Sequence, residues 1–546
     1  MSDELQKQAE APAPEDERDI AKAVEERAAE LLQDEERKPL DPQFVKECLE
    51  GNERGDGCMA ASLFRDRFLL NVTYQKYPDW YAWRGNVWER DDFKESHKAV
   101  EECALEYARQ SMALTQEIKE KRIEKDGDDG WKVTLRDNYL SRVKRLRSEN
   151  GIKKALAMAA IVDSAAMACR ESDFNQQPWL LPVTNGVIDL RTGALTSGVP
   201  SDRMTKALPI EYDPHAEYGP WIDFVKEVSG SEEMERFQRR SFGCGATGFS
   251  HEQYIWVYIG PGRNGKGLLF NLIADVLGPY YHEISRAMIL EQKNEPSANA
   301  ASEHKYSLLN KRIIVAAETN KGQKIDAAAL KSLTGQNRIV CRPNFSSEII
   351  FEPTHSTFLQ TNNMPFGLTK EFSLIERLLI IDFPFMYVDD PEEKKRKFPV
   401  LADKFRKKDP KLYDKLSQYK PGILRWLVEG CLEWQQIGLA PPAQVLECVN
   451  KLANDEDYVQ RFVDSCLDHW PGPDDHQLKT SCSQIYDVFK WWWQENSDQS
   501  DKHVPAMKTI NKALRDKGHI VEPSGGKTWV WRITVKQDVV ENMRKE

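Results

Sequence analysis

The sequence predicts an α/β protein with a P-loop core, an α+β N-terminal domain and a C-terminal domain of helices and a β-hairpin. Three observations support this fold class. A strand, a glycine-rich loop and a helix follow one another within residues 254–278. Three further apolar strands come after this unit and alternate with helical patterns, which favours a parallel sheet. Near the C-terminus, two helical patterns precede a pair of strands joined by Gly525-Gly526.

The glycine-rich loop lies between the two elements that a P-loop requires. Tyr254 to Ile259 is aromatic and β-branched, which is typical of a buried strand. Leu268 to Leu277 has apolar residues at helical spacing. The N–H groups of such a loop bind phosphates, and Lys266 reaches the β- and γ-phosphates. The predicted ATP-binding residues are Gly260, Pro261, Gly262, Arg263, Asn264, Gly265, Lys266, Gly267 and Leu268.

One position departs from the P-loop pattern. The motif expects Ser or Thr after the lysine, where the hydroxyl binds Mg²⁺, and this chain has Gly267. Three alternatives stay open: a water replaces the hydroxyl, another side chain takes the metal, or nucleotide binding is weaker.

Composition excludes several classes of protein. The net charge is -11, but residues 1–60 hold eighteen acids and eight Lys or Arg, a net of -10. The remaining chain is near neutral, so nucleic acid is not excluded as a partner. No apolar run could span a membrane, and the polar start predicts no secretory signal. The 10 cysteines are scattered without a Cys-x-x-Cys pair, which indicates reduced thiols, so a cytoplasmic location is expected.

The N-terminal region predicts a tail followed by a folded domain. Residues 1–40 are acidic and lack an apolar face, which predicts disorder. Residues 41–215 predict an α+β domain: a helix over 41–50, a turn over 51–57 and a hairpin over 80–88. The aromatic residues of that hairpin either stack bases or pack a small core.

Basic helices and short strands complete this domain. Residues 101–172 look helical and contain the most basic stretch, which either contacts a nucleic-acid backbone or is a solvated face. Residues 179–195 predict short strands with turns at Asn185-Gly186 and Thr192-Gly193.

Two polar residues follow the strands after the P-loop. Glu318 ends the strand from Arg312, and Asn362 ends the strand from Ser356. Ligands of parallel sheets lie at the carboxyl ends of the strands, so both side chains should face a nucleotide held at Lys266. A carboxylate that polarises water and an amide that orients it are what phosphate hydrolysis needs.

These segments resemble the superfamily 3 helicases of AAA+ type, specifically the phage/plasmid and poxvirus-like primase–helicase family. Gly260 to Lys266 is similar to the family's Walker A, and Val315 to Thr319 to its Walker B. Thr361 to Pro365 resembles sensor 1, and Arg377 the arginine finger. The other matching segments are 185–193, 330–342, 421–426 and 439–441.

The resemblance implies a function and a set of site residues. It implies an ATP-dependent replicative DNA helicase of a phage or mobile element that uses Mg²⁺. The enzyme would act on single-stranded or forked DNA as a ring, as a hexamer, with any primase or polymerase on a separate polypeptide. The implied catalytic residues are Lys266, Glu318, Asn362 and Arg377, with Glu318 acting as either metal ligand or general base.

The resemblance also implies a DNA contact. Alternating residues within 332–350 predict a hairpin that would project into the pore of a ring, with Lys331, Arg338 and Arg342 near phosphates. Alternatively, the two arginines pair with acids of their own subunit. The further domains are a helicase core over 216–390, a helical extension over 391–455 and a winged-helix-like domain over 456–546.

Two other functions compete with the helicase. An ATP-switched replication initiator with little unwinding is kept open by Gly267. A packaging or defence ATPase is disfavoured by the matches at Thr334-Gly335 and Thr361-Asn362 and by the lack of a nuclease motif.

Overall fold

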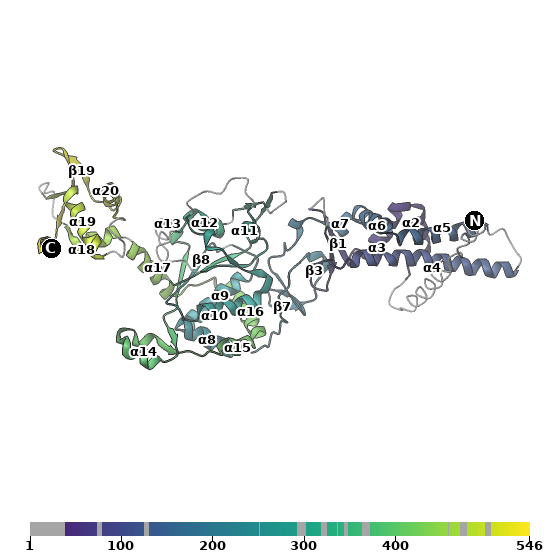
Figure 1. The fold of residues 1–546 in the computed structure, drawn as a ribbon, viewed down its shortest axis with the longest axis horizontal. Coiled ribbons are helices and arrows are strands. Elements are labelled where there is room, and N and C mark those ends of the chain that lie inside the picture. The colour runs from purple at the N-terminus through teal and green to yellow at the C-terminus, as the bar shows by residue number, and fades with distance from the viewer. Residues whose placement is uncertain are drawn as a thin grey trace, which may run out of the picture.

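The computed structural model describes residues 39–73, 79–124, 130–250, 252–291, 302–317, 325–335, 337–342, 348–362, 372–456, 458–469, 478–496 and 504–545. An N-terminal helical part, a central part built on a sheet and a C-terminal part follow one another along the long axis (Figure 1). Most of the predicted tail, residues 1–38, lies outside the described residues. No described helix combines the length and the apolar character needed to cross a bilayer.

The N-terminal part packs helices against a small sheet. The helix predicted over 41–50 is α2, and the Asp41 carboxylate caps it by accepting from the N–H of Gln43. Trp88 of the predicted hairpin is buried and its ring contacts Trp83, so these aromatic residues pack a core. The helices are α2 (Pro42–Glu50), α3 (Asn52–Phe64), α4 (Glu95–Glu124), α5 (Gly130–Leu146), α6 (Glu149–Val162) and α7 (Ser164–Met167); the strands are β1 (Phe68–Asn71), β2 (Asp79–Trp83), β3 (Trp88–Arg90) and β4 (Ala168–Cys169).

The turn predicted over residues 51–57 is wrong, because α3 begins at Asn52. Its glycines permit close packing. A Cβ on Gly55 would lie 1.8 Å from the carbonyl oxygen of Cys48, and one on Gly57 would lie 2.4 Å from the Cβ of Met158. Glycine therefore lets α3 approach its neighbours closely, a role that looks like a turn signal in the sequence.

The central part contains a five-stranded sheet in the order β14-β8-β13-β10-β9, and all neighbouring strands are parallel. This confirms the predicted parallel sheet. Alternate residues of each strand face opposite sides, so Trp256 and Tyr258 enter one buried cluster and Ile255 and Val257 enter another. The strands are β8 (Ile255–Ile259), β9 (Tyr281–Ile284), β10 (Ile313–Ala317), β13 (Ser356–Thr361) and β14 (Leu378–Asp382).

Helices cover both faces of this sheet (Figure 1). One face carries α8 (Gly219–Ser229), α9 (Glu232–Gly245), α10 (Lys266–Leu277) and α16 (Lys420–Ile437). The opposite face carries α11 (Glu303–Tyr306), α12 (Ala327–Thr334) and α13 (Phe372–Ile375), and α17 (Ala443–Glu456) packs on β14. Burial on both faces explains why the strands read as nearly continuous apolar runs.

The strands predicted over residues 179–195 form an antiparallel sheet of β5 (Leu180–Val183), β6 (Gly186–Asp189) and β7 (Ala194–Thr196), with both predicted turns between them. Leu181 and Ile188 belong to the same buried cluster as α8, α9 and α16. Packing therefore groups these strands with the central sheet, although the sequence places the domain boundary at 215.

Two smaller strand pairs extend the central part. The predicted hairpin is the antiparallel pair of β11 (Ile339–Cys341) and β12 (Ile349–Phe351). After β14, the parallel pair of β15 (Met386–Val388) and β16 (Phe405–Lys407) encloses α14 (Pro391–Lys397) and the 3₁₀ helix η5 (Pro399–Lys404). α15 (Leu412–Ser417) leads to α16.

The C-terminal part has the predicted helices and hairpin. Ile485, Phe489 and Trp492 of α19 are buried in a common cluster with α18 and α20. Gly525 and Gly526 form the tight turn of the hairpin with φ of 59° and 77°. The elements are α18 (Tyr458–Cys466), β17 (Leu467–His469), β18 (Lys479–Ser481), α19 (Cys482–Asn496), α20 (Met507–Asp516), β19 (Val521–Ser524), β20 (Lys527–Trp531), β21 (Ile533–Val535) and α21 (Gln537–Lys545).

Candidate functional site

The glycine-rich loop lies at the point where the order of strands in the sheet reverses. β8 lies between β13 and β14, and the chain leaves it for the distant edge strand β9 before returning to β14 on the other side. The loop follows the carboxyl end of β8, which is where open α/β sheets bind ligands. The predicted location of the site therefore agrees with the topology of the sheet.

Two glycines give the loop its shape. Gly260 has a φ of +150°, and a Cβ there would lie 2.4 Å from the carbonyl oxygen of Phe383. Gly265 has a φ of +90°, and a Cβ there would lie 2.7 Å from Cγ1 of Val228 in α8. Any larger residue at these positions would be strained and would collide with its neighbours. The loop is thus held closely between β14 and α8.

Lys266 begins α10 and turns its ammonium group into the loop. Its Nζ donates to the carbonyl oxygen of Gly260 at 2.8 Å and to Oδ1 of Asn362 at 3.2 Å. The side chain is buried, and this burial lowers the pKa of Lys266 to about 8, against an opposing effect of Asp382. The structure therefore brings together Lys266 and Asn362, two of the predicted catalytic residues.

Other loop residues tie the loop to the segment after β14. Asn264 is buried, and its Nδ2 donates to the carbonyl oxygen of Phe383 at 3.4 Å. The carbonyl oxygen of Arg263 accepts from the N–H of Tyr387 at 2.8 Å. Pro261 and Gly262 form the exposed tip, and Leu268 packs against the core. A displacement of the Phe383–Tyr387 segment would consequently move the loop.

Gly267 has open space where the P-loop pattern expects a hydroxyl. A Cβ on Gly267 would meet only Nε2 of Gln360, at 3.9 Å. A serine would fit there without a collision. Gln360 lies next to the end of β13, so its amide is the side chain closest to the missing hydroxyl.

Asp382 is a residue of this site that the sequence did not single out. It ends β14 opposite Ile259, the last residue of β8, and its charge acts on Lys266. Burial raises the pKa of the Asp382 carboxyl, while Lys404, Lys266 and Lys451 act to lower it. The signal was present in the sequence, because an acid closes a run of four apolar residues at 378–381.

Glu318 lies outside the described residues, so its predicted roles as metal ligand and catalytic acid or base stay predictions. The strand before it, β10, ends at Ala317, which pairs with Gln360 of β13. Among the described residues, no three acids, histidines or cysteines gather as a metal cluster. The oxygen donors nearest to the loop are therefore single side chains, Asp382 and the amides of Gln360 and Asn362.

Arg377 lies where the parallel strands begin, called the amino edge of the sheet here, whereas the glycine loop lies where they end, the carboxyl edge. It precedes β14, and its carbonyl oxygen accepts from the N–H of Ile255, the first residue of β8. Its guanidinium donates to Oγ1 of Thr334 at 3.1 Å. The five residues of β8 separate this position from the glycine loop by about 16 Å. Arg377 therefore does not meet Lys266 within one chain.

The predicted DNA-contacting hairpin also lies at this amino edge. Nε of Arg338 lies 3.5 Å from Oε1 of Glu352, and both side chains are exposed. The paired part of the hairpin ends at Cys341 opposite Ile349, so Arg342 and Glu348 are the next residues on its two sides. Lys331 is in the last turn of α12, before the hairpin. The pairing of Arg338 corresponds to the alternative of an arginine held by an acid of its own subunit.

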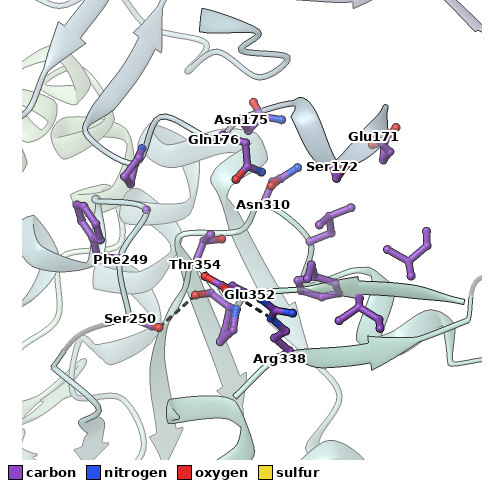
Figure 2. A pocket seen from close by; sticks show the side chains of 17 residues that line it. Glu171, Ser172, Asn175, Gln176, Phe249, Ser250, Asn310, Arg338, Glu352 and Thr354 are labelled. Atoms are coloured by element: carbon purple, nitrogen blue, oxygen red, sulfur yellow. Dashed lines mark hydrogen bonds and ion pairs between the residues drawn. The ribbon is translucent and has the colours of Figure 1, made fainter. Parts of the chain in front are cut away.

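A pocket of about 730 Å³ lies beside the hairpin, remote from the glycine loop. Figure 2 shows a dashed line between Arg338 and Glu352 at one side of the pocket and the amides of Asn175, Gln176 and Asn310 near one another above them. The pocket contains none of the residues of the loop, so it does not belong to the predicted site.

Comparisons with known proteins cover most of the chain. Residues 61–230 match the family described as "D5 N terminal like", and residues 258–377 match a family of unknown function, DUF5906. The chain is 25% identical over 465 residues to L207/L206 of Acanthamoeba polyphaga mimivirus, a protein named as a helicase, covering 82% of this chain and 46% of that one. It is 22% identical over 471 residues to 022R of Frog virus 3, also named as a helicase, covering 71% and 47%.

The chain spans about half the length of these relatives. Among solved structures, the apo C-terminal region of NrS-1 (305–718) aligns with 70% of this chain and 90% of its own, at 11% identity and a TM-score of 0.38. The D5 match and the viral relatives agree with the resemblance found in the motifs. The D5 match and the viral relatives therefore support a phage and viral primase–helicase family of superfamily 3 type for this chain.

Proposed function

We propose that this chain is an ATP-dependent replicative DNA helicase that translocates on single-stranded DNA as a ring, a hexamer. One observation carries the proposal: a glycine loop at the reversal point of a parallel sheet holds a buried lysine against an asparagine from the neighbouring strand. The names of the viral relatives support the choice of a helicase among the enzymes that use such loops.

The residues of the loop fit a nucleotide and Mg²⁺. The loop has no room for side chains at Gly260 and Gly265, as expected where backbone must approach phosphates. Gln360 and Asp382 offer the oxygen ligands that Mg²⁺ prefers, and Glu318 is the predicted third donor. A bound Mg²⁺ would neutralise charge on the β- and γ-phosphates.

Each side chain has a defined task in this proposal. Lys266 holds a positive charge next to the transferring phosphoryl group, and Asn362 orients the attacking water or the γ-phosphate. Glu318 takes the proton of that water or holds the metal. Arg377 supplies its charge to the nucleotide of the neighbouring subunit, because its position at the opposite edge excludes its own nucleotide.

The finer architecture belongs to the same proposal. We assign the central part to the AAA+ type and the C-terminal part to a winged helix. On α20, Lys508 and Lys512 are exposed while Ile510 and Leu514 are buried, so the basic side chains face away from the core. Such a helix can contact phosphates or bases. A separate primase or polymerase and a location in the host cytoplasm complete the proposal.

Two measurements test this function. ATP turnover is measured with and without single-stranded DNA, and unwinding of a labelled fork is followed with ATP and with a non-hydrolysable analogue. We expect turnover to rise with DNA and unwinding to require ATP. A protein that binds DNA and hydrolyses ATP but never opens the fork would contradict the helicase.

A second candidate is a replication initiator whose DNA binding is switched by ATP. The open space at Gly267 favours it, because the chain lacks the hydroxyl that binds Mg²⁺ in the P-loop pattern, and phosphoryl transfer depends on that metal. The two functions differ in one result. The initiator would show nucleotide-dependent DNA affinity with negligible turnover and no unwinding.

A further inference from the structure

A strongly basic segment follows β14 and is used by none of the roles described above. Residues 391–411, called the basic lobe here, comprise α14, η5, β16 and the four residues after it. They contain nine lysines and arginines and four acids, a net charge of +5 in a chain whose total is -11. α14 projects from the body of the central part (Figure 1). This segment lies within the helical extension predicted over 391–455, and the sequence assigns no binding role to it.

Six of the nine cations of the lobe are exposed, and among the described residues only Lys395 pairs with an acid, Glu392. Lys397, Lys408 and Lys411 are exposed and form no ion pair among the described residues. The basic N-terminal helices differ in this respect, since Arg147 pairs with Glu101 and Lys154 pairs with Glu53. Exposed, unpaired cations contribute little to the stability of the fold and are available to bind a polyanion.

Apolar side chains accompany these cations. Phe398 is 43% exposed, Leu401 37% and Val400 97%. Nζ of Lys397 lies 5.8 Å from the centre of the Phe398 ring. Aromatic rings beside cations are the combination on which single-stranded nucleic acids bind, with bases stacked and phosphates paired. A membrane surface fits less well, because α14 has no apolar face and buries no residue.

The lobe is connected directly to the glycine loop. β16 pairs in parallel with β15, and Tyr387 of β15 donates its N–H to the carbonyl oxygen of Arg263. The guanidinium of Arg406 in β16 lies 4.1 Å from the centre of the Phe385 ring, just before β15. A ligand that orders the lobe therefore acts on a strand that is bonded to the loop.

We propose that the basic lobe binds the backbone of single-stranded nucleic acid and that this binding promotes turnover at the adjacent glycine loop. The inference rests on the proposed function, because it adds a nucleic-acid contact to that ATPase. It assigns the contact to the carboxyl edge of the sheet, in addition to the hairpin predicted at the amino edge. The affinity should depend on salt and be blind to sequence, as phosphate contacts are.

The test uses the full chain with Lys397→Gln, Lys408→Gln and Lys411→Gln combined. The matched control removes three paired cations from the N-terminal helices: Arg147→Gln, Lys153→Gln and Lys154→Gln. Binding of a fluorescent oligo-dT is followed by anisotropy across a salt series, and basal ATP turnover is measured without DNA. We expect the lobe variant to bind about tenfold or more weakly, with a salt slope lower by about 2. Basal turnover and the control should match wild type.

Two further experiments distinguish base stacking from phosphate contacts and single strands from a duplex. Phe398→Ala should weaken oligo-dT binding several-fold without changing the salt slope, because it removes stacking and no charge. A blunt duplex should lose less affinity than oligo-dT in the lobe variant. Unchanged oligo-dT affinity and slope in the lobe variant, while wild type still unwinds forks, would overturn this inference and leave the helicase standing. Loss of binding to phosphatidylserine vesicles with DNA binding intact would overturn it in favour of a membrane contact.

Discussion

The two edges of the central sheet hold their charged residues in different ways. At the carboxyl edge, Lys266 is buried and meets Asn362 within hydrogen-bond distance. At the amino edge, Arg377 bonds Thr334 and Arg338 lies near Glu352, each with a partner close by. The carboxyl edge brings two predicted catalytic residues together at one loop, while each of the two arginines at the amino edge contacts a partner of its own. Under the proposed function, a site that needs both Lys266 and Arg377 is therefore shared between two copies of the chain.

The largest effect is expected at the carboxyl edge. Lys266→Ala removes the only side-chain ammonium that the described structure places in the loop, so ATP turnover should fall below detection. Release of inorganic phosphate measures it, and circular dichroism confirms folding. Glu318→Gln should also abolish turnover, and the amount of ATP that stays bound is compared with that of Lys266→Ala. Full turnover in Lys266→Ala would remove the basis of the P-loop assignment.

The second-largest loss of ATP turnover is expected at the amino edge, on removal of Arg377. Arg377→Ala should lower turnover by about 10³–10⁵-fold if its charge acts on a nucleotide in trans. Thr334→Val is the matched control, because it breaks the hydrogen bond to Arg377 and keeps the guanidinium. Turnover close to wild type in Thr334→Val is expected. Equal losses in both variants would mean that Arg377 only holds the end of α12.

A smaller effect, on DNA binding, is expected from the hairpin of β11 and β12. Arg338→Gln combined with Arg342→Gln should lower the salt slope of single-stranded DNA binding by about 1, through loss of phosphate contacts. The effect is reduced because Arg338 already lies near Glu352. Glu352→Gln should act in the opposite direction and raise DNA affinity. If turnover changes and DNA affinity does not, the arginines belong to the subunit interface.

Nucleotide affinity should depend on pH at the carboxyl edge. Burial lowers the pKa of Lys266 to about 8 in the free protein, and a bound phosphate raises it again. Binding therefore takes up a proton above pH 8, and the affinity for ADP should fall as the pH rises, by up to about tenfold per unit. Fluorescent ADP titrations between pH 7 and 9.5 measure this dependence. Lys266→Ala should show a flat profile over the same range.

The smallest effect concerns Gly267. A serine fits the space there, so Gly267→Ser should lower the Mg²⁺ concentration needed for half-maximal turnover by a few-fold. Gln360→Ala is the companion variant, because its amide is the group nearest to that space. If Gly267→Ser changes nothing in wild type and restores turnover in Gln360→Ala, the glutamine is the replacement ligand.

Local signals explain what the sequence could predict. The run from Ile255 to Leu277 contains a β-branched strand, a glycine loop and an apolar helix, and each reads the same way in sequence and structure. The residues missed depend on distant partners. Gly55 looks like a turn residue but allows close helix packing, and Asp382 joins the site through its pairing opposite Ile259. No pattern of neighbouring residues predicts the helix packing at Gly55 or the strand pairing of Asp382.

The same limit applies to charge. The basic stretch near residue 150 and the basic lobe look alike in sequence, yet Arg147 and Lys154 have acid partners while Lys397 has none among the described residues. Which cations are free depends on helices that meet across the fold. Likewise, Leu181 of β5 and Ile188 of β6 pack in the same buried cluster as α16, whereas the boundary predicted at residue 215 separates them from it.

The most direct test of the two-edge account mixes two inactive variants. Lys266→Ala lacks the carboxyl-edge cation and Arg377→Ala lacks the amino-edge cation, so each ring alone should be inactive. In mixed rings, some interfaces join an intact loop to an intact arginine, and we expect turnover to return to a measurable fraction of wild type. Differently tagged subunits that co-purify prove that mixed rings form. If mixed rings form and turnover stays absent, Arg377 does not act in trans and the account of a site shared between the two edges is wrong.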